Sequence, residues 1–171
     1  DYLFQCVEFW IKEFDIDGIR LDCANVLDFG FMEELRQVTG RLKEDFWLMG
    51  EVIHGDYARW VNPRTLHSVT NYELHKSIYS GFNDHNFFEI AHNVRRLEAI
   101  GRDLYTFVDN HDEDRIASKL KDEMHLAPVY MCLYTLPGVP SVYYGGEWAV
   151  QGRRTRTSDQ ELRPAISPEQ F

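Results

Sequence analysis

Apolar residues along this chain recur at two spacings, one typical of amphipathic helices and the other of buried strands. Between residues 3 and 14 they return every three or four positions, as in Leu3, Val7 and Trp10, which predicts a helix with one buried face. Short continuous apolar runs predict strands that are covered on both faces. The predicted strands are residues 19–23, 46–50, 68–72, 104–108 and 139–144, and the later predicted helices are residues 31–42, 57–61, 87–100 and 126–136.

Strand and helix alternate five times, without a change in composition that would mark a linker. Such alternation predicts a parallel sheet with right-handed crossovers, either open or closed into a barrel. A nucleotide-binding open sheet carries a glycine-rich turn after its first strand, whereas residues 22–25 here are Asp-Cys-Ala-Asn. The pattern therefore favours an α/β fold, a partial (β/α)8 TIM barrel formed by residues 1–171 as one piece. A complete barrel needs eight units in roughly 250 residues, so these strands either belong to a larger barrel or pair with another copy.

The chain is acidic, with a formal net charge of −10 from 28 Asp and Glu against 18 Lys and Arg. This balance disfavours nucleic acid as a partner, because phosphate backbones bind clustered Lys and Arg. The one basic run, Arg153, Arg154 and Arg156, lies in a polar tail that is typical of a solvated loop. No apolar run is long enough to span a membrane, so a membrane is not expected as a partner either.

Three cysteines, Cys6, Cys23 and Cys132, each lie in an apolar stretch and show no CxxC spacing. They predict small buried side chains in a reduced compartment such as the cytoplasm. The chain opens inside its first amphipathic pattern, so we expect its natural beginning to be missing. Secretion of a longer protein therefore stays open.

Three carboxylates, Asp22, Glu51 and Asp112, stand at the C-terminal ends of predicted strands. In a (β/α) barrel the active site lies at that end of the strands. Two carboxylic acids that flank a bond are the minimum equipment for cleaving a glycoside. The same three residues therefore predict the fold, the site and the chemistry.

Arg20 and Asp22 are two residues apart on a predicted strand, so both side chains point to the same face. A guanidinium beside a carboxylate keeps it ionised, as a glycosidase nucleophile must be; a structural ion pair is the alternative. Glu51 has apolar neighbours, which favour a protonated general acid, with a helix N-cap as the alternative. His54 follows within reach of the site, although an ordinary loop histidine is favoured for that residue alone.

Asn110, His111 and Asp112 close the fourth predicted strand. Two donors and a carboxylate are enough to bind two adjacent hydroxyls of a sugar. A metal site at His111 and Asp112 is the less favoured alternative. Its further ligands would be Glu113 and Asp114, and adjacent residues rarely share one metal ion. No cofactor is expected.

These residues lie in strings that resemble conserved regions of a known family. GIRLD, GEVIH and FVDNHD are similar to three regions of the α-amylase family of glycoside hydrolases, in the same order. LPGVPSVYYGGE resembles the family's eighth strand, with Gly146-Glu147 where Asp-Glu is usual, and DQELRP resembles the Asp…Arg-Pro segment after it. Within the family, CANV and TNYEL are nearest to cyclomaltodextrinases and neopullulanases, with Val26 where Glu is usual and Ile53 where Trp is usual.

The resemblance implies that Asp22 is the nucleophile, Glu51 the general acid and base, and Asp112 a third carboxylate that binds ring hydroxyls. Arg20 would orient Asp22, and His111 would contact the same sugar. The implied reaction is retaining hydrolysis or transfer at an α-glucosidic bond of starch-derived oligosaccharides or cyclodextrins. The expected substrate-binding residues are Arg20, His54, Asn110 and His111.

The family's first conserved region, Asp-x-x-x-Asn-His, is absent from the sequence. We therefore expect strands four to eight of a barrel here, with the first three strands and an inserted calcium-binding domain before residue 1. Edges left open at residues 19–23 and 139–144 predict self-association. A catalytically silent fragment, or a binding or assembly unit, is the alternative interpretation. A barrel enzyme acting on phosphorylated metabolites is a weaker third, because Gly145-Gly146 is a thin phosphate loop.

Overall fold

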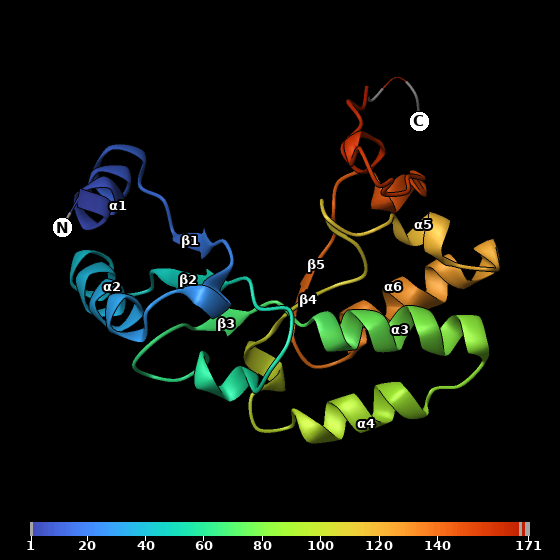
Figure 1. Cartoon of the computed structure of the whole chain (residues 1–171), viewed down its shortest axis with the longest axis horizontal. Helices are drawn as coiled ribbons and strands as arrows, with labels where there is room; N and C mark the ends of the chain where they lie inside the picture. The colour runs from blue at the N-terminus through green and yellow to red at the C-terminus, as the bar shows by residue number, and fades with distance from the viewer. Residues whose placement is uncertain (1, 168, 170–171) are drawn as a thin grey trace. The chain divides into compact units, whose positions relative to one another are not determined.

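The computed structural model describes residues 2–167 and 169. The chain divides into two compact units, Asp1–Thr70 with Asp103–Tyr105, and Asn71–Arg102 with Thr106–Phe171 (Figure 1). None of the helices in the described part combines the length and the apolar character that a bilayer crossing requires.

The first unit is built around a parallel sheet of three strands, in the order β1 (Gly18–Leu21), β2 (Trp47–Gly50) and β3 (Ser68–Val69). Helix α1 (Tyr2–Phe14) packs against α2 (Phe29–Leu42). Leu48 of β2 and Val69 of β3 are fully buried. The carboxylate of Asp28 accepts a hydrogen bond from the Phe31 amide and so caps α2. Two 3-10 turns follow the first two strands, at Ala24–Val26 and Tyr57–Arg59.

The second unit contains helices α3 (Tyr72–Asp84), α4 (Phe88–Arg96), α5 (Ile116–Lys119) and α6 (Leu126–Thr135). Helices α3 and α4 lie side by side (Figure 1). Strand β4 (Tyr105–Phe107), whose first residue belongs to the first unit, pairs with β5 (Val139–Ser141). The core includes Ile78, Val108, Val129 and Leu133, all almost inaccessible to solvent. Further 3-10 turns lie at Gly101–Asp103, Glu123–His125, Gly146–Trp148 and Gln160–Leu162.

All five predicted strands are present, but each is shorter than predicted. The prediction is wrong at Tyr72, which begins α3 rather than ending β3, because the Asn71 side chain accepts a hydrogen bond from the Leu74 amide and caps the helix. The fifth strand ends at Ser141 instead of Tyr144. The parallel sheet confirms the α/β arrangement, while closure into a barrel stays a prediction.

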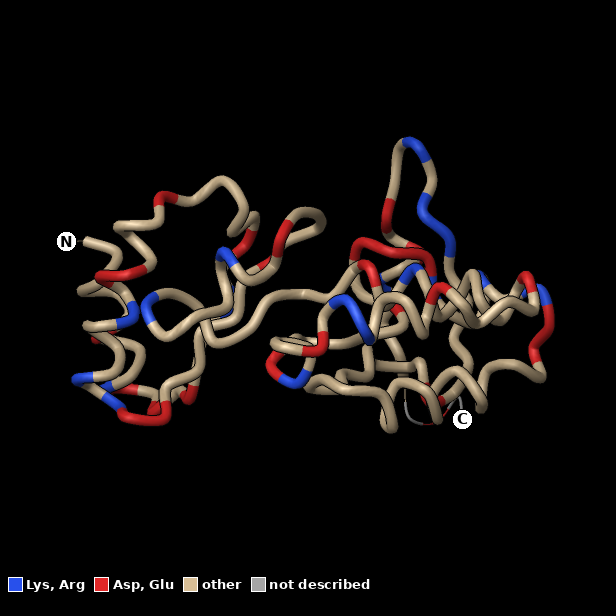
Figure 2. The backbone as a smooth tube through the Cα atoms, turned by 90° about the horizontal axis from the view of Figure 1, so that it is seen from below, with Lys and Arg blue, Asp and Glu red and all other residues tan. Residues whose placement is uncertain are grey.

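The basic run lies on a loop of the second unit, as the sequence predicted. Figure 2 shows this loop, with its basic positions in blue, extending away from the rest of the second unit. The amide of Arg154 donates to the carboxylate of Asp114 at 2.7 Å, and the Arg153 guanidinium lies 3.6 Å from the same carboxylate. The loop therefore carries partly compensated charge.

Candidate active site

Two of the predicted carboxylates follow neighbouring strands of the first unit. Asp22 comes directly after β1, and Glu51 comes directly after β2. The two strands run parallel with Leu21 opposite Gly50. Their carboxyl ends therefore meet at one edge of the sheet and bring the two side chains together.

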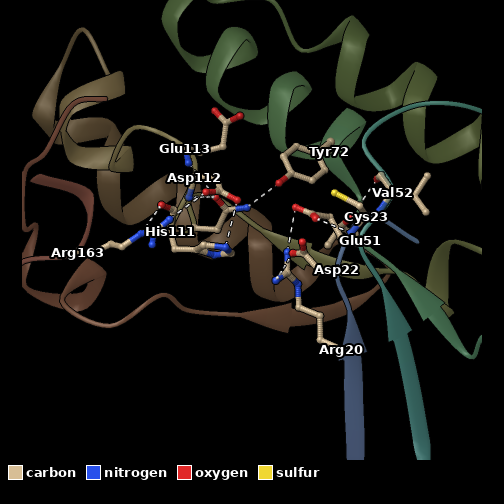
Figure 3. Close-up of polar contacts among 12 residues, drawn as sticks. Arg20, Asp22, Cys23, Glu51, Val52, Tyr72, His111, Asp112, Glu113 and Arg163 are labelled. Carbon is tan, nitrogen blue, oxygen red and sulfur yellow. Dashed lines mark hydrogen bonds and ion pairs between the residues drawn. The ribbon is translucent and has the colours of Figure 1, made fainter. Parts of the chain in front are cut away.

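Arg20 joins the two carboxylates (Figure 3). Its guanidinium Nη1 lies 3.3 Å from Asp22 Oδ1, and its Nη2 lies 2.9 Å from Glu51 Oε1. The contact with Asp22 confirms that residues 20 and 22 present their side chains to the same face. The two partners differ in environment, because the Asp22 side chain is 76% exposed and that of Glu51 only 8%.

Further hydrogen bonds hold Glu51 in place. Its Oε2 accepts from the backbone amide of Cys23 at 3.1 Å, and its own amide donates to Leu21 O at 2.8 Å. Behind it, Gly50 leaves no room for a side chain, since a Cβ there would lie 2.5 Å from Leu66 Cδ1 and 2.8 Å from Ala24 Cβ. The sequence places a glycine here, where the backbone passes too close to its neighbours for a side chain.

Cys23 corrects a sequence prediction, because its side chain is exposed rather than buried. It has a left-handed backbone with φ of 46°, which turns it out of the strand direction. The neighbouring Asp22 carboxylate is the main cause that raises the pKa of the thiol. Cys6 and Cys132 are half-buried.

Within the described part of the chain, Asp22, Cys23 and Glu51 could also hold a metal ion. Each offers a ligand atom, and the three atoms lie within 4.8 Å of one another. The Arg20 guanidinium already contacts both carboxylates, so a cation would have to compete with a positive charge. The geometry therefore favours a carboxylate pair organised by arginine over a metal centre.

The third carboxylate, Asp112, lies in the second unit on the loop after β4. Its Oδ2 is 3.1 Å from His111 Nε2 and its Oδ1 is 3.2 Å from Arg163 Nη2 (Figure 3). Arg163 also donates to His111 O at 3.1 Å and pairs with Asp159 at 2.7 Å. Arg163 is not among the site residues expected from the sequence, although it lies in the DQELRP string.

Glu113, next along the loop, forms a partly buried charge cluster with two helical residues. Lys119 Nζ contacts Glu113 Oε2, and His75 Nε2 lies 3.5 Å from the same oxygen. Hydrogen bonds from His75 and then Lys119 lower the pKa of Glu113 to about 2. Burial lowers the pKa of His75, which favours its neutral form. The alternative of Glu113 as a metal ligand is therefore not supported, because its carboxylate is engaged by protein donors.

Asn110 and His54 occupy different settings. The Asn110 side chain lies within the second unit, where its amide contacts the loop backbone and Tyr72. His54 lies in the first unit and is exposed. The sugar contacts predicted for both residues stay predictions.

Two buried ionisable residues behind the loop were not anticipated from the sequence. Arg115 is fully buried, donates to Tyr144 O at 2.6 Å and lies over the Tyr143 ring at 4.2 Å. Asp109 is also buried, and its Oδ2 accepts from the Ile116 amide at 2.9 Å. Burial raises the pKa of Asp109. Asp109, at the start of the loop, thus contacts α5, and Arg115, at its end, contacts the segment after β5.

Comparisons with known proteins agree with these observations. A family model described as "Alpha amylase, catalytic domain" matches residues 1–168. A cyclomaltodextrinase from Thermoanaerobacter pseudethanolicus is 32% identical over 161 residues, which cover 88% of this chain and 28% of that protein. A maltogenic alpha-amylase from Bacillus acidopullulyticus is 31% identical over 160 residues, covering 89% of this chain and 27% of that protein. A neopullulanase from Thermoactinomyces vulgaris is a further relative. This chain spans less than a third of the length of each of these three relatives.

A solved structure extends the likeness to the fold. An Anoxybacillus alpha-amylase superposes with a TM-score of 0.83 at 28% identity, covering 98% of this chain and 40% of that one. The predicted likeness to cyclomaltodextrinases and neopullulanases is confirmed.

Proposed function

Because this chain belongs to the α-amylase family of glycoside hydrolases, we propose that it carries the carboxylates that cleave α-glucosidic bonds with retention of configuration. The observation that carries the proposal lies at the ends of β1 and β2. One oxygen of Asp22 and one of Glu51 lie within 4.8 Å of each other, and Arg20 contacts both residues. Carboxyl groups about 5–5.5 Å apart are typical of retaining glycosidases, whereas inverting enzymes separate them by about 6.5–9.5 Å to admit a water.

Asp22 is the proposed nucleophile. Its carboxylate is exposed and can approach the anomeric carbon of a bound sugar, while Arg20 fixes its orientation. In the first step an Asp22 oxygen forms a bond to that carbon as the bond to the glycosidic oxygen breaks. The product is a covalent β-glucosyl enzyme.

Glu51 is the proposed general acid and base. It gives its proton to the departing glycosidic oxygen in the first step, and takes a proton from the attacking water in the second. The water displaces Asp22 and restores the α configuration. Burial of Glu51 and its hydrogen bond from the Cys23 amide hold the carboxyl in one place for both transfers.

Asp112 and His111 are the proposed ligands of ring hydroxyls, with His54 as a peripheral contact. The carboxylate, imidazole and neighbouring guanidinium of Arg163 form a compact polar group of the kind that binds adjacent hydroxyls. The names of the relatives support starch-derived oligosaccharides or cyclodextrins as the substrate class. The family likeness likewise supports a partial barrel containing strands four to eight, and the chemistry needs no cofactor.

The test uses the protein in its full natural length with a maltooligosaccharide and a cyclodextrin as substrates. Asp22→Asn should lower kcat by about 1,000-fold or more, since the substituted amide is a far weaker nucleophile. Asp45→Asn, which neutralises an exposed carboxylate elsewhere in the first unit, should stay near wild type. Proton NMR of the first-formed product should show the α anomer. Release of the β anomer, or an active Asp22→Asn enzyme, would refute the proposal.

A further inference from the structure

The side chain of Asn110 is occupied at both ends of its amide by groups of the protein. Its Oδ1 accepts hydrogen bonds from the backbone amides of Asp112 and Glu113, both at 2.9 Å. An amide oxygen has two lone pairs, so these two donors use its acceptor capacity. The orientation of the amide follows, because only the oxygen can face two N–H groups.

The other end of the amide is tied to helix α3. Asn110 Nδ2 donates to the Tyr72 hydroxyl at 3.1 Å (Figure 3). Tyr72 is the first residue of α3, and its ring meets that of Phe107 at 5.0 Å and 80°. Phe107 is buried at the end of β4. The anchor of Asn110 is thus a phenol held edge-to-face against the strand that precedes the loop.

The residues fixed in this way carry the polar groups of the loop. The Asp112 carboxylate lies between His111 and Arg163, and the Glu113 carboxylate contacts Lys119 and His75. Residues outside the loop therefore hold its carboxylates, whereas Asn110, a residue of the loop itself, holds the loop backbone. A shift of the Asp112 amide would move its carboxylate by a similar amount.

We propose that Asn110 is a positioning residue, which sets the loop backbone so that Asp112 meets the sugar in a fixed orientation. This differs from the sugar-ligand role that the sequence suggested for Asn110. The inference rests on the proposed function of Asp112. Asn110 would act on the reaction through Asp112, with Tyr72 as its support.

The first experiment measures backbone hydrogen exchange by NMR or mass spectrometry on residues 108–115 and requires no turnover. Asn110→Ala should speed exchange of the Asp112 and Glu113 amides by roughly tenfold or more, since both lose their acceptor. Asn110→Asp should restore slow exchange, because a carboxylate accepts from both amides and also from the Tyr72 hydroxyl. Unchanged exchange in Asn110→Ala would overturn the proposal.

The second experiment measures kcat and KM in the full-length protein. Asn110→Ala should lower kcat by about 30-fold to 100-fold with KM within about threefold, since misplacement of a catalytic group acts mainly on the transition state. Asn110→Asp should recover kcat to within about fivefold of wild type. Tyr72→Phe removes only the hydroxyl that supports Asn110, so its kcat should lie between those of Asn110→Ala and Asn110→Asp. This variant replaces Asn110→Ala in the test if Asn110→Ala does not fold.

The matched control is Asn62→Ala in the first unit, whose side chain also accepts from a backbone amide two residues on, that of Arg64 at 3.0 Å. It should leave both constants within about twofold. A sugar-donating Asn110 would instead give an Asp variant as poor as Ala with a raised KM, and that result would overturn the proposal. A wild-type protein without α-glucan hydrolysis would refute the proposed function, while the exchange experiment would still decide whether Asn110 fixes the loop.

Discussion

The charge of Glu113 should stabilise the second unit in a pH-dependent way. The contacts with His75 and Lys119 lower the Glu113 pKa from an ordinary 4.5 to about 2. A group whose pKa is lower in the folded state binds fewer protons there than in the unfolded state. Its stabilisation is therefore complete above pH 4.5 and is lost as the pH falls towards 2.

The magnitude follows from the size of the pKa change and from solvent access. A fully buried carboxylate with this change would contribute about 3 kcal/mol at neutral pH. The Glu113 side chain is 33% exposed, so water screens part of the interaction. We therefore expect Glu113→Gln to lower the free energy of unfolding by about 1–2 kcal/mol at pH 7.

The assay is urea unfolding of wild type and Glu113→Gln at pH 7, 4.5 and 3, followed by circular dichroism. The difference between the two proteins should shrink steadily below pH 4.5, because the wild-type carboxylate takes up a proton in the unfolded state while it stays ionised in the folded state. Glu98→Gln removes an exposed carboxylate from the same unit and should change stability by less than about 0.5 kcal/mol. An undiminished difference at pH 3, or none at pH 7, would refute the reasoning.

Three further predictions concern the first unit and the whole chain. Gly50→Ala should lower the free energy of unfolding by about 1–3 kcal/mol in urea titration, because its Cβ would overlap Leu66; an unchanged midpoint would contradict this. Iodoacetamide should label the exposed Cys23 before the two half-buried cysteines, and the labelling rate should rise with pH because the raised pKa of Cys23 leaves little thiolate at neutral pH. Peptide mass spectrometry would follow the labelling, and earlier labelling of Cys132 would contradict this prediction. The isolated 171-residue chain should self-associate through its strand edges, and a monodisperse monomer in light scattering would contradict that.

The sequence predicts local geometry well where one spacing governs the outcome. Arg20 and Asp22 share a face because side chains of a strand alternate, and their ion pair confirms it. The strands themselves follow from apolar runs between breaks. The sequence places Tyr72 at the end of a predicted strand, while the deciding interaction is a helix cap from the preceding Asn71 side chain.

Contacts between distant parts of the chain were harder to foresee. Arg163 reaches Asp112 from 51 residues away, and no local pattern encodes that pairing. Cys23 has apolar neighbours on one side in sequence, yet its left-handed backbone turns the thiol outward. Arg115 is charged and fully buried, against the usual preference of arginine, because two aromatic rings and a carbonyl receive its guanidinium.

The contact of Arg20 with both proposed catalytic carboxylates follows from the pairing of two strands. β1 and β2 are neighbours in the three-stranded sheet and run parallel, so Asp22 and Glu51 follow the carboxyl ends of paired strands. The register explains the place of Arg20 between them. Arg20 is opposite Met49, and these residues lie two positions before Asp22 and Glu51 respectively, so all three side chains that meet share one face. The sheet thus brings two carboxylates together at the ends of paired strands, with the guanidinium of Arg20 in contact with both.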